Sequence, residues 1–310
     1  MEFITDLGRM REWAEQRRAA GARIGLVPTM GALHDGHMEL VRRALGTSDL
    51  VVVSIFVNPI QFNSTSDFER YPRDVEQDAA QLAEAGVDAL FVPEAAAMYP
   101  PGFETHVEVE RATAPLCGAC RPGHFRGVTT VVAKLFNIVQ PRVAVFGEKD
   151  YQQLVAIRRM VTDLGFGIEI VGVPTVRERD GLALSSRNRR LSAADRAAAR
   201  CVPRALRAAM DLAAAGELTR EGLLEAVSRE VGTESRARLE YADLRHPETL
   251  EEMATVDGEA RLALAVWVGE VRLIDNCLIT SRGVAAAGLN GRCALESREG
   301  QPTLAAGEGT

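Results

Sequence analysis

The sequence predicts an α/β fold in which a doubly wound parallel sheet is followed by a second, smaller α+β domain. The first half alternates short runs of β-branched residues with helical segments, which is typical of βαβ units. The run LVVVSIFV at residues 50–57 is almost uniformly apolar, as expected for a strand buried on both faces. After Pro174 the chain changes to Ala-rich helical stretches and then to alternating apolar and polar runs. The first domain is therefore expected to be Rossmann-like.

Strands and crossover helices are expected to alternate through the first domain. The expected strands are residues 23–29, 50–57, 89–93, 142–146 and 167–173. Helices near 37–47, 74–86, 126–139 and 150–164 supply the crossovers that parallel strands require. Residues 1–21 are interpreted as one amphipathic helix, with charges scattered along it.

The length of 310 residues favours two domains, at roughly 150 residues per domain. The predicted boundaries give a first domain at 1–174 and a second at 175–281, which is expected to close over the site of the first. In the second domain, helical stretches at 192–216 and 219–231 precede the alternating runs RLEYADLR and RLALAVWV. Ser192 is expected to cap the first of these helices. Residues 282–310 lack periodicity and are predicted to be a disordered tail.

Composition limits the function classes. The net charge of −7 and the pI near 5.4 argue against a sequence-independent nucleic-acid binder, because neutralising phosphates needs clustered Lys and Arg. No stretch reaches the roughly 18 apolar residues of a membrane-spanning helix, and no secretory signal is recognised. Five cysteines, an odd number, fit reduced thiols better than a disulfide framework. We therefore expect a cytoplasmic protein.

A Cys-x-x-Cys pair at Cys117 and Cys120, with His124 four residues further on, needs weighing as a zinc or redox site. Structural zinc normally takes four ligands, and only three candidate ligands stand here. No second pair follows, and the surrounding sequence is not thioredoxin-like. We interpret the pair as incidental and assign no metal to it.

The segment PTMGALHDGH at residues 28–37 carries the strongest chemical signal. It lies where the first expected strand ends and the next helix begins, and such junctions offer unpaired N–H groups to phosphate. His34 and His37 are three residues apart, so both rings project toward one side of the first helical turn. Two of the five histidines fall in this stretch, which favours a phosphate site over two surface histidines. The sequence has neither GxxxxGK[ST] nor GxGxxG here.

Two further segments carry groups that bind phosphate. Lys149 in FGEKDYQQ again follows an expected strand and opens a helix at the same sheet edge, although a solvated ion pair with its acidic neighbours is the alternative. Ser185, Ser186 and Arg187 in the loop LSSRN offer hydroxyls and a guanidinium to phosphate oxygens. Alone this loop is a weak signal, since it also fits the approach to a helix N-terminus.

The tetrapeptide HDGH is similar to the HxGH signature of the nucleotidylyltransferase superfamily, whose chemistry is attack on an α-phosphate. LSSRN resembles that superfamily's KMSKS-type loop. With FVNPIQF, YPRD, RPGHFRGV and FGEKDYQQ in the same order, the chain resembles the pantothenate synthetase family from about residue 1 to residue 280. The resemblance implies that pantoate attacks ATP to give pantoyl adenylate and pyrophosphate, and that β-alanine then displaces AMP. It also implies magnesium as cofactor and a homodimer.

By this resemblance, His37 donates a proton to the leaving group, and Lys149 with the Ser185–Arg187 segment stabilises the departing pyrophosphate. Leu184 stands where the family commonly has Met, a volume-conserving change that is expected to be tolerated. The implied ATP-binding set is Met30, Gly31, Ala32, Leu33, His34, Asp35, Gly36, His37, Gly147, Glu148, Lys149, Asp150, Val176, Leu184, Ser185, Ser186 and Arg187.

The resemblance also implies that Gln61 and Gln153 bind pantoate, with Asn58 close by, since the buried hydroxyls and carboxylate of pantoate need matching partners. Asp78 is the candidate magnesium contact, because magnesium prefers hard oxygen ligands. The neighbouring Asp74 and Glu76 are alternatives to it. Lys134, Arg121 and His124 are secondary candidates for the site.

Two other functions stay open from the sequence. One is a nucleotidylyltransferase that moves AMP onto a phosphate acceptor, which the HxGH element alone does not distinguish. Gln61 and Gln153 argue against it, because a phosphate acceptor would favour arginine or lysine in that pocket. The other is a catalytically silent nucleotide-binding regulator, which would be expected to have lost Lys149 or the serines of the LSSRN loop.

Overall fold

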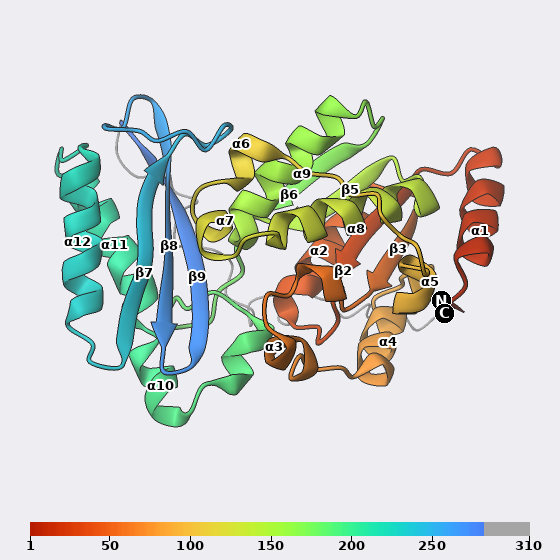
Figure 1. Ribbon diagram of the computed structural model, residues 1–310, viewed down its shortest axis with the longest axis horizontal. Helices are drawn as coiled ribbons and strands as arrows, with labels where there is room; N and C mark the ends of the chain where they lie inside the picture. Colours follow the sequence, from red (N-terminus) through yellow and green to blue (C-terminus); the bar gives the residue numbers. More distant parts are fainter. Residues whose placement is uncertain (282–310) are drawn as a thin grey trace, which may run out of the picture.

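A computed structural model describes residues 1–281 of the chain, which form two packed units (Figure 1). The first is built around a six-stranded sheet with the strand order β1-β4-β3-β2-β5-β6, in which every neighbouring pair is parallel. The strands are β1 (Glu2–Ile4), β2 (Ile24–Thr29), β3 (Leu50–Ile55), β4 (Ala89–Phe91), β5 (Val143–Gly147) and β6 (Glu169–Val173).

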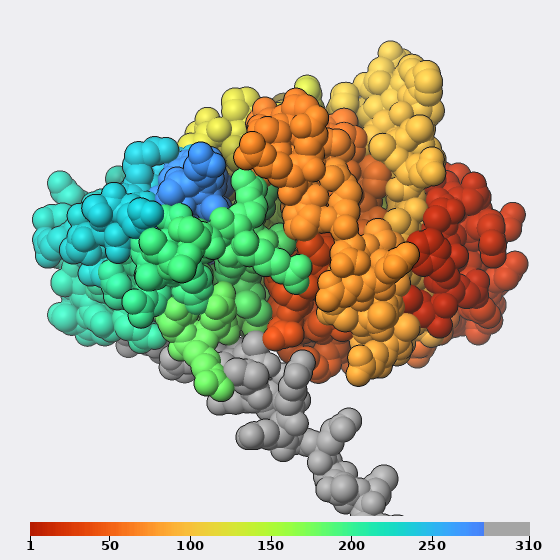
Figure 2. Space-filling view, turned by 90° about the horizontal axis from the view of Figure 1, so that it is seen from below, coloured from red at the N-terminus to blue at the C-terminus, as the bar shows by residue number. Residues whose placement is uncertain are grey.

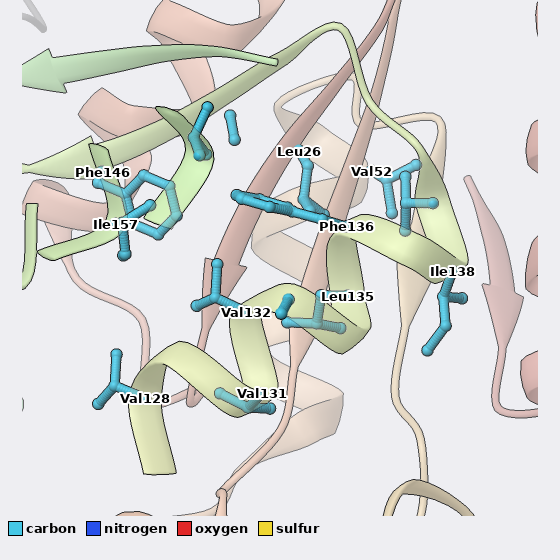
Figure 3. Close-up of a cluster of buried hydrophobic side chains, with 14 of the residues drawn as sticks. Leu26, Val52, Val128, Val131, Val132, Leu135, Phe136, Ile138, Phe146 and Ile157 are labelled. Atoms are coloured by element: carbon cyan, nitrogen blue, oxygen red, sulfur yellow. The ribbon is translucent and has the colours of Figure 1, made fainter. Parts of the chain in front are cut away.

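Helices cover both faces of this sheet, because the strands alternate apolar side chains between two separate cores. One core lies under α2 (Asp35–Leu45) and α4 (Val75–Glu84). The other lies under α1 (Leu7–Ala19), α8 (His124–Val139) and α9 (Tyr151–Asp163). Figure 3 shows the second core, in which Phe136 of α8 lies close to Leu26 of β2 and Val52 of β3. Double winding therefore follows from strands that are apolar on both faces.

Short helical segments connect the main elements of this unit. They are η1 (Pro59–Gln61), α3 (Thr65–Glu69), α5 (Ala95–Met98), α6 (Glu110–Thr113), α7 (Cys117–Cys120) and η2 (Glu148–Asp150). The chain then leaves β6 and passes through η3 (Ser186–Arg190) into the second unit.

The second unit packs helices on a three-stranded antiparallel sheet with the order β7-β8-β9. Its strands are β7 (Ala237–Arg245), β8 (Glu259–Val268) and β9 (Val271–Thr280), and its helices are α10 (Ala193–Ala198), α11 (Cys201–Ala214) and α12 (Arg220–Gly232). A third apolar core joins α11 and α12 to the sheet. Ser192 caps α10 as predicted, since its hydroxyl accepts from the amide of Asp195 at 3.1 Å.

The predicted fold class is confirmed, with three corrections to single elements. The helical stretch predicted over 192–216 is two helices, because α10 ends at Ala198 and α11 begins at Cys201, with Pro203 in its first turn. The N-terminal segment is not helical throughout, because residues 2–4 form an edge strand that pairs with β4 before α1 begins. Three residues are too short to give a period-2 signal. The third strand of the second sheet, VRLIDNCLIT, was also missed, because its polar residues interrupt the apolar run. Each of the five strands predicted for the first domain is present, with ends shifted by up to two residues.

No helix within residues 1–281 is long and apolar enough to cross a membrane. The boundaries proposed at residues 174 and 281 stay predictions, and the tail predicted at 282–310 lies outside the described residues.

Gly127 lies near the start of α8, where the helix packs tightly against the segment after β3. A β-carbon there would lie 2.6 Å from the carbonyl oxygen of Ile60 and 2.8 Å from the backbone nitrogen of Gln61. Since backbone must move to admit it, we expect Gly127→Ala to lower the free energy of unfolding by about 1–3 kcal/mol, measured by urea denaturation. The matched control is Gly232→Ala on α12, where nothing lies within 4 Å. Equal stability of both variants would contradict the tight packing.

Candidate active site

A cavity of about 220 Å³ opens at the carboxyl ends of the parallel strands, between the segments that follow β2 and β5. These two strands are sheet neighbours, yet the chain after β2 runs to β3 on the opposite side. The site thus lies at the topological switch point, where a crevice forms because the two connections leave in opposite directions. The sequence predicted two phosphate-binding segments at this edge, and the structure brings residues of both into one cavity.

His34 and His37 lie side by side at the start of α2. Their ring centroids are 4.1 Å apart, and Nδ1 of His34 caps the helix by accepting from the amide of Gly36 at 3.2 Å. Nδ1 of His37 is buried and has no hydrogen-bond partner. Both histidines line the cavity, so they present ring nitrogens to a ligand at the positive end of a helix.

Both imidazoles are neutral in the free protein at neutral pH. Burial, aided by the nearby charges of His37 and Lys149, lowers the pKa of His34 to about 2. Burial, with Lys149 as the second cause, lowers the pKa of His37 to about 4. A polyphosphate placed between these groups would favour the charged imidazoles and raise both pKa values. Protonation of His37 at neutral pH would therefore depend on the ligand's own charge.

The turn between β2 and α2 is held by a buried carboxylate. Asp78 of α4 is 2% exposed, and its two oxygens accept from the amides of Ala32 and Leu33, each at 2.8 Å. Gly31 and Ala32 both have positive φ, at 80° and 52°, which is unfavourable for alanine. The carboxylate therefore stabilises a strained turn that sets where α2 and its histidines begin.

Asp78, the expected magnesium contact, thus also stabilises the turn between β2 and α2. Within residues 1–281, no group of three or more His, Cys, Asp or Glu side chains is placed to hold a metal ion. Asp74 accepts from the amide of Gln77 as the N-cap of α4, and Glu76 is exposed. The direct contact between Asp78 and magnesium stays a prediction.

Lys149 lies in the η2 turn directly after β5 and lines the cavity opposite the histidines. Its ammonium is 3.5 Å from the carboxylate of Asp150, whose side chain is half exposed. The sequence left open whether Lys149 forms an ion pair with its acidic neighbours, and the structure shows such a pair with Asp150. Since an exposed pair of this kind contributes little, Lys149 remains available to an anion in the cavity.

The loop with Ser185, Ser186 and Arg187 closes the third side of the cavity. It is anchored to the first unit by Asp67 of α3, which accepts from Arg187 at 3.1 Å and from Arg190 at 2.8 Å. The hydroxyl of Tyr71 lies 3.5 Å from that of Ser186. Figure 2 shows the orange segment after β3 beside the green segment after β6. The hydrogen bonds of Asp67 with Arg187 and Arg190 join these two segments. Asp67 and Tyr71 were not assigned roles from the sequence.

Gln61 is buried at the floor of the cavity, where its amide group is fixed by protein contacts. Asn58 donates to its Oε1 at 2.9 Å, and its own Nε2 lies 3.2 Å from the sulfur of Met30. Asn58 is 1% exposed, donates also to the carbonyl of Gly127, and accepts from the hydroxyl of Tyr99 at 2.8 Å. Asn58 therefore orients Gln61, and a direct ligand contact from Asn58 stays a prediction.

Most of the residues predicted from the sequence line the cavity. They are Met30, His34, Gly36, His37, Asn58, Gln61, Gly147, Lys149, Asp150, Gln153, Val176, Leu184, Ser185, Ser186 and Arg187. Others lie outside its lining, namely Gly31, Ala32, Leu33, Asp35, Asp78 and Glu148. The first three shape the turn, and Glu148 lies within 4.0 Å of Arg261 in the second unit. The predicted contact of Asp78 with magnesium and those of the other five residues with ATP stay predictions.

An apolar wall from α8 was not foreseen. Val128, Val131, Val132 and Leu135 line the cavity beside Gln61. The helix was predicted, but an apolar helix face gives the same sequence signal whether it packs on protein or borders a ligand. The pairing of this wall with a buried amide is visible only in three dimensions.

A second cavity of about 450 Å³ continues from the first between the two units. Arg121 and His124 line it, and both lie close to the carbonyl oxygen of Gln61, at 3.4 and 2.8 Å. Cys117 is buried there, with its sulfur 3.2 Å from the hydroxyl of Tyr241. Lys134 is elsewhere, over the rings of Tyr99 and Phe103.

Fold and site together define an enzyme of the HxGH nucleotidylyltransferase class, with paired histidines at the helix that follows the first core strand, opposed by a lysine and a Ser-Ser-Arg loop. A family model described as pantoate–β-alanine ligase matches residues 2–278. The chain belongs to the pantoate–β-alanine ligase family.

Individual relatives support this assignment. The chain is 52% identical over 279 residues to the pantothenate synthetase of Syntrophobacter fumaroxidans and 51% identical to that of Moorella thermoacetica; each match covers 90% of this chain and 99% of the relative. A crystal structure of pantothenate synthetase from Thermus thermophilus is 49% identical with a TM-score of 0.84, covering 89% of this chain and 98% of that one. The ligase from Francisella tularensis, complexed with β-γ ATP and β-alanine, is 36% identical with a TM-score of 0.74, covering 90% of this chain and 97% of that one.

Asp78→Asn tests the turn that positions the histidines. The substitution keeps the side-chain size but replaces one acceptor with an NH₂ group that faces a backbone amide. We expect the free energy of unfolding to fall by about 1–3 kcal/mol, measured by urea denaturation, because a buried amide loses its partner. The control is Glu76→Gln, an exposed residue on the same helix turn. A loss no larger than the control's would show that the carboxylate does not hold the turn.

Proposed function

We propose that this protein condenses pantoate with β-alanine to give pantothenate, with ATP as the energy source and pantoyl adenylate as the intermediate. The proposal rests on one observation: a single cavity is lined both by the phosphate-binding candidates His34, His37 and Lys149 and by the amide side chains of Gln61 and Gln153. The family membership supports the same reaction. In the first step a carboxylate oxygen of pantoate attacks the α-phosphorus and pyrophosphate leaves. In the second, the amine of β-alanine attacks the acyl carbon, loses a proton, and AMP leaves.

The phosphate side of the cavity suits the first step. His34 and His37 approach from the N-terminus of α2, Lys149 from the turn after β5, and the Ser185–Arg187 segment from the loop after β6. Negative charge moves onto the leaving pyrophosphate as the bond breaks. Groups that are already fixed around that position stabilise the transition state more than the ground state. Gly147, Asp150, Val176 and Leu184 would meet the rest of the nucleotide.

The floor of the cavity suits pantoate. Gln61, Gln153, Val128 and Val132 line this part of the cavity. The two amide groups would bind the hydroxyls and carboxylate of pantoate, and the two valines would border its methyl groups. This combination of neutral donors and an apolar wall disfavours a phosphate acceptor, which would need cations in that place. Transfer of AMP to a phosphate ester is therefore the weaker candidate. A silent regulator is disfavoured because Lys149, Ser185 and Ser186 are present and line the cavity.

Magnesium fits this site as part of the nucleotide. Because magnesium keeps several waters and is usually held by substrate phosphates and one or two carboxylates, it needs no closed protein cage. Asp78 stays the proposed protein contact, through the lone pairs that the amides of Ala32 and Leu33 leave free on its two oxygens. The metal would neutralise phosphate charge during the first step. By resemblance we also propose a cytoplasmic homodimer. Light scattering after size-exclusion chromatography would contradict the dimer if it gave the monomer mass.

The adenylate route predicts isotope exchange between pyrophosphate and ATP that depends on pantoate and needs no β-alanine. With β-alanine added, AMP and pantothenate should form in equal amounts, measured by chromatography. We expect His37→Ala to slow the exchange by roughly 10²–10³-fold, as for the loss of one oxyanion donor.

His106→Ala is the matched control for this variant, because His106 is exposed and lies outside the cavity. It should exchange at the wild-type rate. ADP as product, or exchange without pantoate, would sink the adenylate mechanism. An unchanged rate in His37→Ala would remove His37 from it while leaving the reaction itself in place.

A further inference from the structure

Two adjacent residues of β9, Asp275 and Asn276, each contact a segment that leads to the phosphate side of the cavity. They belong to the second unit, on the strand that the sequence did not predict. Asp275 is 2% exposed and Asn276 is 5% exposed. Buried polar groups that reach across a domain interface are costly unless their partners are well placed, which makes these contacts worth following.

Asn276 binds the turn that carries Lys149. Its Nδ2 donates to the carbonyl oxygens of Glu148 and Lys149, at 3.0 and 3.1 Å. Both hydrogens of the amide are thus used on two successive peptide groups of η2. This two-point contact fixes the rotation of the turn as well as its position, and the Lys149 side chain starts from that backbone.

Arg261 of β8 orients the Asn276 amide. Its Nη1 donates to Oδ1 of Asn276 at 3.0 Å, so the oxygen points toward Arg261 and the NH₂ group toward η2. The guanidinium itself stacks 3.8 Å from the ring centroid of Tyr151, at the start of α9. Only this orientation of the Asn276 side-chain amide satisfies its oxygen and its NH₂ group together. If the amide were flipped, its NH₂ group would face the guanidinium of Arg261.

Asp275 holds the other segment. Its carboxylate forms a bidentate pair with Arg177, at 2.6 and 2.9 Å, and Arg177 also donates to the carbonyl of Gly181 at 3.0 Å. Arg177 begins the loop that returns at Leu184, whose amide donates to the carbonyl of Val176, and Ser185 follows directly. The backbone N–H of Asn276 donates to Oδ1 of Asp275 at 2.8 Å. This hydrogen bond links the residue that holds the Lys149 turn to the residue that holds the loop after β6.

We propose that Asn276 is a positioning residue for the first half-reaction, because it holds the Lys149 turn in register with the Ser185–Arg187 segment through the neighbouring Asp275. The inference rests on the proposed adenylation. Lys149 and the serine loop approach the cavity from different parts of the chain, so their spacing is not set by either segment alone. A displacement of about 1 Å at a charged group can cost 10²-fold in rate.

The test uses two substitutions in the full-length protein, Asn276→Ala and Asn276→Asp. Alanine removes both donors; aspartate keeps the volume and the acceptor for Arg261 but sets a carboxylate against two carbonyl oxygens. We expect both to lower kcat for pantoate-dependent pyrophosphate exchange by about 10- to 100-fold. The KM for pantoate should change less than threefold, because the Gln61 floor is untouched. If the alanine variant does not fold, the aspartate variant carries the same test.

A double-mutant cycle with Lys149→Ala separates positioning from general damage. If Asn276 acts through Lys149, then adding Asn276→Ala to the Lys149→Ala protein should slow exchange by less than about threefold. A full additional loss would overturn the proposal, since Asn276 would then act elsewhere. Wild-type exchange in Asn276→Asp would also overturn it.

The control is Asp243→Asn, a buried carboxylate of β7 that binds Arg220 and Arg245 within the second unit. It should lose stability, measured by urea denaturation, yet keep kcat within about threefold. A loss of kcat equal to that of the Asn276 variants would assign the effect to a loosened domain and overturn the proposal. A wild-type protein with no exchange would count against the proposed function instead.

Discussion

The hydrogen bonds from Asp78 to the amides of Ala32 and Leu33 are the constraint on which the site depends. The chain must turn sharply from β2 into α2, and it does so through two residues with positive φ. Without a buried acceptor, two amides would be unsatisfied and the turn could relax. Because α2 starts at a fixed point, the two histidines face the end of β5. A structural carboxylate thus decides where phosphate chemistry can occur, although it does not line the cavity.

Electrostatics limit how much positive charge the cavity wall carries before a ligand binds. His34 and His37 are held neutral by burial, so the permanent positive charges facing the cavity come from Lys149 and Arg187. Arg187 is already paired with Asp67, which limits the repulsion among cations in the free protein. A polyphosphate would add charge of the opposite sign and favour protonation of both rings. The site is therefore tuned to a strongly anionic ligand more than to a carboxylate alone.

Local signals in the sequence predicted the fold class and the segments of His34, Lys149 and Ser185, while most other residues of the cavity lining were implied by the resemblance to a known family. Buried strands give apolar runs, and a histidine pair at a strand-to-helix junction has few other uses. Sequence reasoning missed β9 because polar residues interrupt the apolar pattern, and those residues, Asp275 and Asn276, act at the domain interface. It predicted Asp78 as a magnesium contact, but it could not show that both oxygens of this carboxylate also accept from backbone amides. Contacts between distant segments, such as Tyr71 with Ser186, leave no periodic trace.

The division of labour between the two units follows from these contacts. The parallel sheet supplies strand ends and a helix N-terminus, while the loop after β6 is also held from outside the sheet. The second unit places the polar pair of β9 between that loop and the Lys149 turn, and Asp67 holds the loop from the opposite side. Three segments from separate parts of the chain are thereby fixed relative to one another. The edge of the parallel sheet could bind phosphate alone. Holding Lys149 and the Ser185–Arg187 segment at a fixed spacing around the leaving group requires the second unit.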